Sequence, residues 1–103
     1  MGRKVIVFCY GKQAGILSEN NDEYVFTYDD EYRGKPISLS LPLSKKTFPS
    51  KGLHPFFKTL APEGWLKKRY SELQHIDERD LFGFLIRNGS DLLGAITFLE
   101  VND

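Results

Sequence analysis

Cysteine is nearly absent from this sequence, and long hydrophobic runs are missing from its N-terminal region. The single cysteine, Cys9, excludes an internal disulfide, which fits a reducing compartment. The apolar run at residues 5–10 is too short to cross a membrane, and no small-residue cleavage site follows it. We therefore expect a cytoplasmic domain without a membrane anchor.

An excess of charge of one sign is also lacking. Fourteen basic and 14 acidic side chains cancel, which argues against a protein that coats nucleic acid along its whole surface. The 103 residues predict a single domain, 1–103, that hides roughly 65% of its accessible surface on folding. This length excludes a complete kinase, a TIM barrel or a dinucleotide-binding enzyme.

The charge is nevertheless divided along the chain. Residues 1–32 carry net −3, residues 33–69 carry net +8, and residues 70–103 carry net −5. One interpretation is that the acidic ends and the basic middle face each other as weak surface pairs. The other is a basic face that meets an acidic partner or phosphates.

Strand patterns dominate the first half of the chain. Residues 4–10 are β-branched and aromatic, and Gly11-Lys12 is a turn signal before a short strand at 14–17. Residues 24–28 alternate between the two faces of a strand. Residues 37–41 alternate too, and Pro42 would end that strand. Short links between these strands predict an antiparallel meander.

Helical patterns follow. Pro55 suits the start of a short helix that carries Phe56 and Phe57. Pro62 suits the start of a second helix, whose residues Leu66, Tyr70 and Leu73 form a stripe expected to face the core.

The third helix is expected between an N-cap at Asp77 and a C-cap at Asn88-Gly89. Residues 95–101 are expected to add a last strand. The predicted fold class is therefore α+β: an antiparallel sheet, made of the meander and the C-terminal strand, with about three helices packed on one face.

Catalytic and metal-binding patterns are missing from the sequence. There is no phosphate-binding glycine loop and no kinase catalytic motif. His54 and His75 lie too far apart to form a usual zinc site with one cysteine, and we expect them at a loop or cap and at a helix end. Cys9 is expected to be buried and inert, and Ser38 and Ser40 have no nearby histidine. We predict no catalytic residue, no metal and no cofactor, and so a protein that is not an enzyme.

The only tryptophan does not fit the packing pattern. On a helical wheel with about 100° per residue, Trp65 lies about 100° from Leu66, outside the apolar stripe and near Arg69. One interpretation is that Trp65 folds back onto Phe56 or Phe57. The other is a protruding anchor, because Trp and Arg dominate interface hot spots.

Six segments in order give a family resemblance: GKQAGIL, YVFTY, PISLSLPL, PFF, LAPEG and GAITF, at residues 11–17, 24–28, 36–43, 55–57, 60–64 and 94–98. Together they resemble the N-terminal subdomain of HipA-type toxin kinases, from about Lys4 to Leu99. The ATP-binding and catalytic residues of that family lie in a later part of HipA, so none is carried over to this chain.

A separate copy of this subdomain is similar to the HipS family, the small third component of tripartite HipBST toxin–antitoxin systems. In these systems HipT resembles a HipA kinase that lacks this segment, and HipB is a helix-turn-helix DNA-binding protein. The resemblance implies an antitoxin that binds HipT and blocks its kinase activity, in a complex that includes HipB and without direct DNA binding of its own.

The predicted partner-binding residues are Pro62, Glu63, Gly64, Trp65 and Arg69. Residues 60–64 match the HipA motif, whereas Trp65 is not part of the general HipA pattern. We expect Trp65 to insert into the kinase cleft while the basic middle segment assists docking.

Two other functions are compatible with these features. The second hypothesis is a complementing lobe or scaffold that helps a split kinase fold or act. Growth on co-expression with the kinase separates the two, because an antitoxin restores growth and an activating lobe worsens the arrest. Direct nucleic-acid binding through residues 33–69 is the third hypothesis, and it predicts an affinity that falls steeply with salt.

Overall fold

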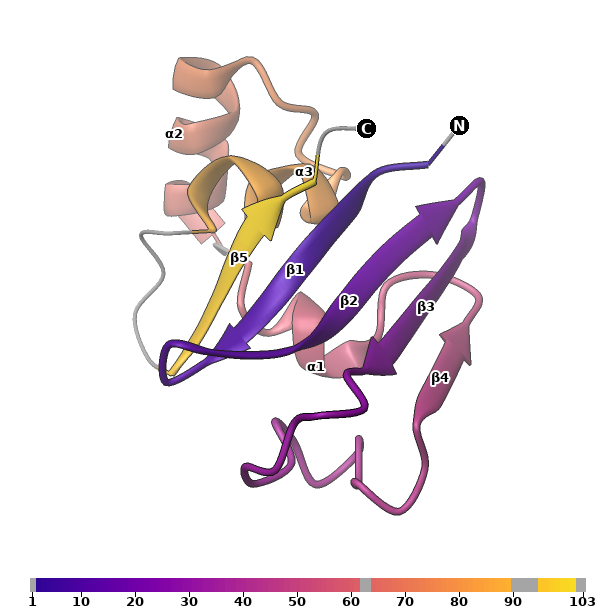
Figure 1. Cartoon of the computed structure of the whole chain (residues 1–103). Coiled ribbons are helices and arrows are strands. Elements are labelled where there is room, and N and C mark those ends of the chain that lie inside the picture. Colours follow the sequence, from indigo (N-terminus) through magenta and orange to yellow (C-terminus); the bar gives the residue numbers. More distant parts are fainter. Residues whose placement is uncertain (1, 62–63, 90–94, 102–103) are drawn as a thin grey trace.

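Five antiparallel strands form one sheet (Figure 1). The computed structural model describes residues 2–61, 64–89 and 95–101, with the backbone only for Gly64 and Trp65. The strands are β1 (Lys4–Cys9), β2 (Lys12–Asn20), β3 (Glu23–Tyr28), β4 (Thr47–Ser50) and β5 (Ile96–Glu100). Their order in the sheet is β4-β3-β2-β1-β5, so the C-terminal strand pairs with the N-terminal strand.

Three helices lie between β4 and β5 in the chain: α1 (Pro55–Lys58), α2 (Gly64–Gln74) and α3 (Leu81–Asn88). They lie on the same side of the sheet, with α1 and α3 behind the strands and α2 towards one end (Figure 1). The predicted α+β architecture is confirmed.

The core lies between the sheet and two of the helices. Strand β1 buries every second side chain, as the alternation of a half-buried strand requires. This face of the sheet meets Phe57 of α1 and Phe82 and Leu85 of α3, each at most 1% exposed. The Phe57 ring packs at 5.6 Å from Phe26 and 5.9 Å from Phe98, measured between ring centroids. Helix α1 thereby joins both halves of the sheet.

The strand predicted at residues 37–41 is wrong. This segment is a turn-rich loop, and the place next to β3 is taken by β4, where Phe48 pairs with Phe26. The Tyr28 hydroxyl holds the loop, because it donates to the Leu41 carbonyl at 2.5 Å and accepts from the Ile37 amide at 3.0 Å. Ile37 and Leu41 are therefore buried without belonging to a strand, while Leu39 is 98% exposed.

The predicted start of the third helix is also wrong. Helix α3 begins after Asp80, whose carboxylate accepts from the Gly83 amide at 3.1 Å and acts as the N-cap. The Asp77 carboxylate instead accepts from the Arg79 amide within the preceding turn. The end of the helix at Asn88, followed by Gly89, is confirmed.

Arg3 connects three elements at the edge of the core. Its guanidinium donates to the Glu19 carboxylate of β2 at 2.7 and 2.8 Å and to the Asp80 cap of α3 at 2.8 and 2.9 Å. It also lies 5.2 Å from the centroid of the Phe82 ring. Hydrogen bonding to Arg3 holds the pKa values of both carboxyl groups below their usual range.

We expect Arg3→Met to lower the free energy of unfolding near pH 7 by about 1–3 kcal/mol. The methionine keeps an apolar contact with Phe82 but removes the guanidinium that donates to both carboxylates, which retain only the Tyr24 hydroxyl at Glu19 and the Gly83 amide at Asp80. Because the folded-state pKa values of Glu19 and Asp80 are lowered, the stability they contribute is present above their ordinary values of 4.5 and 3.8. That contribution is lost as the pH falls through the lowered folded-state values.

Urea unfolding near pH 7 and at about pH 2.5 measures this effect. The difference between wild type and Arg3→Met should shrink at the acidic pH. Lys4→Met is the matched control, since it removes the same charge from the neighbouring residue and Lys4 forms no ion pair among the described residues. An equal loss in both variants would contradict the role of Arg3.

Candidate functional site

Helix α2 contains three of the five predicted partner-binding residues, Gly64, Trp65 and Arg69. The chain reaches it from α1 through a tight turn, in which the amides of Leu60 and Ala61 donate to the carbonyls of Phe57 and Lys58. Ala61 is buried in the core, so the end of this turn is fixed shortly before α2 begins at Gly64.

Polar contacts hold the other end of α2. The side-chain amides of Gln74 and Asn88 exchange two hydrogen bonds, at 2.8 and 3.1 Å, and so connect α2 to α3. The Ser71 hydroxyl donates to the carbonyl of Ile76 beyond the helix end. His75 stands just after the helix with a φ of 57°, which confirms its predicted position at a helix end.

The apolar stripe of α2 does not face the core, and this prediction is wrong. No residue from 66 to 74 is buried, and Leu66 and Leu73 are 38% and 64% exposed. The physical reason is space: Phe57 of α1 and Phe82 and Leu85 of α3 already cover the inner face of the sheet. Helix α2 therefore presents apolar side chains that the described part of the fold does not cover.

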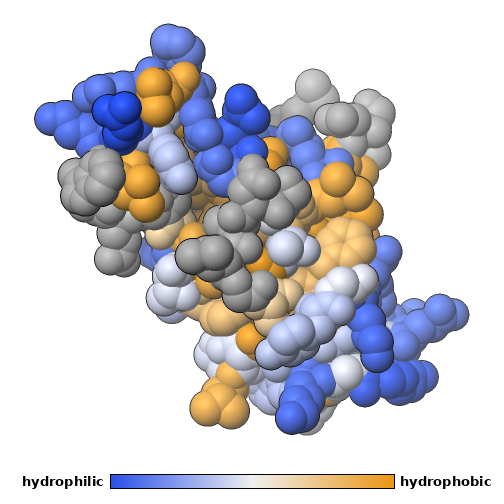
Figure 2. Space-filling model, turned by 90° about the vertical axis from the view of Figure 1, so that its left-hand side faces the viewer, coloured by the Kyte–Doolittle hydropathy of each residue, from blue (hydrophilic) through white to orange (hydrophobic). Residues whose placement is uncertain are grey.

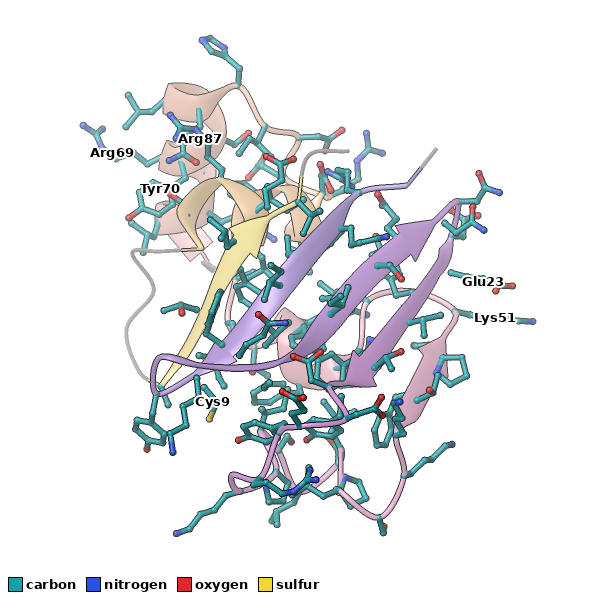
Figure 3. The ribbon with its side chains drawn as sticks, viewed as in Figure 1. Cys9, Glu23, Lys51, Arg69, Tyr70 and Arg87 are labelled. Atoms are coloured by element: carbon teal, nitrogen blue, oxygen red, sulfur yellow. The ribbon has the colours of Figure 1, made fainter. Side chains whose placement is uncertain are left out.

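Basic side chains accompany these leucines. Lys68 and Arg69 are exposed and Lys67 is half-buried. Figure 3 shows Arg69 and Tyr70 projecting from the side of α2 that faces away from the sheet. Tyrosine and arginine are enriched at protein interfaces, so this surface of α2 is a candidate docking surface.

The structure places the five predicted partner-binding residues as follows. Pro62 and Glu63 lie outside the described residues. Gly64 and Trp65 are the first residues of α2, and the Trp65 side chain lies outside the description. Arg69 is exposed on the next turn of the same helix.

The basic middle segment does not form a single face. Arg33, Lys35, Lys45 and Lys46 belong to the loop between β3 and β4, at the opposite end of the molecule from α2 (Figure 1). Within the described ranges, its only ion pair with an acidic end of the chain joins Lys46 and Asp30. Most of this positive charge is therefore open to an external partner.

The His54 and Cys9 side chains, considered as catalytic or metal-binding groups, pack within the fold. His54 precedes α1 and is buried, with its Nε2 atom 2.6 Å from the Phe48 carbonyl oxygen and its ring edge-on to Phe57. Cys9 is buried at the end of β1, as expected. In the part of the chain that the structure describes, no three His, Cys, Asp or Glu side chains gather closely enough to hold a metal ion. No described helix combines the length and apolarity needed to span a membrane.

A cavity of about 710 Å³, which the sequence did not predict, lies beside the β1–β2 hairpin. Its walls include Ile37, Phe56, Leu60 and Ile96, which come from separate segments of the chain. Hydrophobic residues gather in the middle of the face shown in Figure 2, which is the side with β5 and α2. The walls of this cavity meet only after folding, so the sequence does not predict it. The only local pattern that belongs to it is the turn at Tyr10-Gly11, beside the rim.

The order β4-β3-β2-β1-β5, with three helices inserted before β5, defines an α+β domain whose candidate binding surface is the exposed helix α2. The chain belongs to the HipA N-terminal domain family, whose model matches residues 5–99. The resemblance found in the sequence is thereby confirmed.

Two similar proteins support this membership. A solved structure named as the N-terminal domain of HipA toxin superposes with a TM-score of 0.82 at 42% identity, covering 98% of this chain and 94% of that one. An uncharacterized protein of Haemophilus influenzae is 46% identical over 94 residues, which span 91% of this chain and 89% of the relative.

Proposed function

We propose that this chain is an antitoxin that binds a HipA-like serine/threonine toxin kinase and inhibits it. The partner kinase corresponds to HipT, and the helix-turn-helix protein HipB belongs to the same complex. The observation that carries the proposal is the match of residues 5–99 to the HipA N-terminal domain, together with the 42% identity to the N-terminal domain of a HipA toxin. A domain of this family suits association with a HipA-like chain.

The exposed surface of α2 supports a binding role. Leu66 and Leu73 keep apolar area in contact with water that a partner surface would bury. Helix α2 keeps this area exposed because polar contacts with α3, not burial in the core, fix its C-terminal end. Helix α2 is therefore fixed in position while its apolar side chains stay exposed. A partner can dock on such a helix without a large rearrangement.

The charge of α2 supports docking near a kinase active site. Kinases hold their Mg²⁺ ions with acidic side chains, so their clefts attract cationic groups. Lys68 and Arg69 are exposed on α2, and Trp65 is the second residue of the same helix. We propose that Trp65 enters the cleft and Arg69 pairs with an acidic group beside it, so that the helix blocks the site.

A co-expression experiment tests the proposal. Cells that express the toxin kinase alone should stop growing, and co-expression of this chain should restore growth. Purified kinase should lose its autophosphorylation when this chain is added in stoichiometric amount. Growth arrest that worsens, with higher kinase activity, would instead identify a complementing lobe, and a failure to bind the kinase would overturn the proposal.

A further inference from the structure

Tyr10 occupies a backbone position that does not suit it. The two-residue turn between β1 and β2 has φ values of 52° at Tyr10 and 80° at Gly11. Positive φ at both positions defines a type I′ turn, which favours Asn-Gly, and it is uncommon for an aromatic residue. The side chain gains no burial in return, since Tyr10 is 84% exposed. Strained positions of this kind cluster at functional sites.

The residue stands at the rim of the cavity beside the hairpin. The cavity holds about 710 Å³, within the range of ligand-binding pockets. Phe56 and Leu60 on the α1 side and Ile37 from the loop after β3 give it apolar walls. Its interior therefore suits an apolar side chain.

Two lysines complete the rim. Lys12 and Lys35 both line the cavity and both are exposed. Among the residues whose placement is described, neither has a carboxylate within salt-bridge distance. The Tyr32 hydroxyl donates to the Lys35 carbonyl at 2.5 Å and fixes the backbone at that point. An apolar hollow with two exposed ammonium groups at its rim is complementary to an apolar side chain next to a carboxylate.

The cavity is close to α2 along the chain. Leu60 forms part of its wall, Ala61 is anchored in the core, and α2 starts at Gly64. Lys35 at the rim belongs to the loop at the opposite end of the molecule from α2, so a partner that contacts both must cover most of the molecule's 39 Å length.

We propose that the cavity, with Tyr10, Lys12 and Lys35 at its rim, receives an acidic segment of the partner kinase that inserts one apolar side chain. This inference rests on the proposed function and adds a second anchor to the contact made by α2. Tyr10 packs against the inserted segment, and the two lysines pair with its carboxylates.

Tyr10→Asn separates folding from binding, because the two effects have opposite signs. Asparagine suits the type I′ turn, so the melting temperature of the free chain should rise by about 2–5 °C. The Kd for the purified kinase should nevertheless increase about tenfold or more, since the aromatic contact is lost. A stabilised variant that binds as tightly as wild type would overturn the proposal.

A charge-reversal pair tests the lysines. The double variant Lys12→Glu, Lys35→Glu should raise the Kd for the kinase about 10- to 100-fold more than the control Lys51→Glu, Lys58→Glu. Both variants change the net charge equally, and the control lysines line a different hollow. Lys51 follows the edge strand β4 and lies across the width of the sheet from Cys9, which lines the cavity (Figure 3).

The outcomes separate the two proposals. If wild type fails to bind the kinase, both the proposed function and this inference fall. If wild type binds and the rim double variant binds like its control, the antitoxin role stands and the inference falls. Circular dichroism confirms folding, and Lys12→Ser, Lys35→Ser replaces the rim variant if reversal disturbs the hairpin.

Discussion

Trp65→Ala is expected to weaken binding to the partner kinase by about 30- to 1,000-fold and to abolish inhibition. The estimate corresponds to about 2–4 kcal/mol, the usual range for a tryptophan anchor buried in a pocket. Trp65 is the only tryptophan of the chain and the second residue of α2. No residue from 66 to 74 is buried, so the helix adds little to the core, and the variant should unfold at nearly the wild-type urea concentration.

The two interpretations of Trp65 give different results in this experiment. An anchor loses affinity and keeps stability, whereas a tryptophan packed on Phe56 or Phe57 loses stability first. Leu39→Ala is the matched control, because it truncates a side chain that is 98% exposed on a loop away from α2. Unchanged inhibition by a folded Trp65→Ala variant would overturn the anchor.

Phe57→Ala is expected to lower the free energy of unfolding by about 3–5 kcal/mol, a large part of the stability of a domain of this size. The Phe57 side chain is fully buried, and its ring contacts Phe26, Phe98 and the His54 ring. Removing it leaves a cavity between α1 and the sheet. We expect the melting temperature to fall by about 12 °C or more.

Phe56→Ala is the control for this core substitution. Phe56 lies on the same short helix but is only partly buried, so its loss should cost about half as much. Equal destabilisation by the two variants, measured by urea unfolding, would contradict the central position of Phe57. Phe57→Ala should also lose inhibition, but only because the domain unfolds, in contrast to Trp65→Ala.

Local patterns were sufficient where one element determines its own structure. The β-branched and aromatic run of β1 and the alternation in β3 predicted strands, and the structure buries one face of each more than the other. Pro55 predicted the start of α1, and Asn88-Gly89 predicted the end of α3. The resemblance carried by residues 11–98 then predicted the family, which the HipA N-terminal domain model confirms.

The wrong predictions all depended on contacts between distant residues. The alternation at 37–41 imitates a strand, but the Tyr28 hydroxyl binds both ends of this segment as a loop. Asp77 and Asp80 are both suitable caps by sequence, and Arg3, far away in the chain, contacts Asp80. The stripe of α2 predicted a buried face, but the helices α1 and α3 already cover the sheet.

The sequence by itself determined the α+β fold class, because alternation, turn residues and helix starts are properties of neighbouring residues, and its ordered motifs carried the resemblance to the HipA N-terminal domain. Only the tertiary structure decided which apolar side chains remain outside the core and which residues surround the cavity. The reason is that a core has limited room: once Phe57, Phe82 and Leu85 fill it, Leu66 and Leu73 stay exposed on α2. The surface proposed for the partner on α2 therefore consists of apolar side chains that the core has no room to bury.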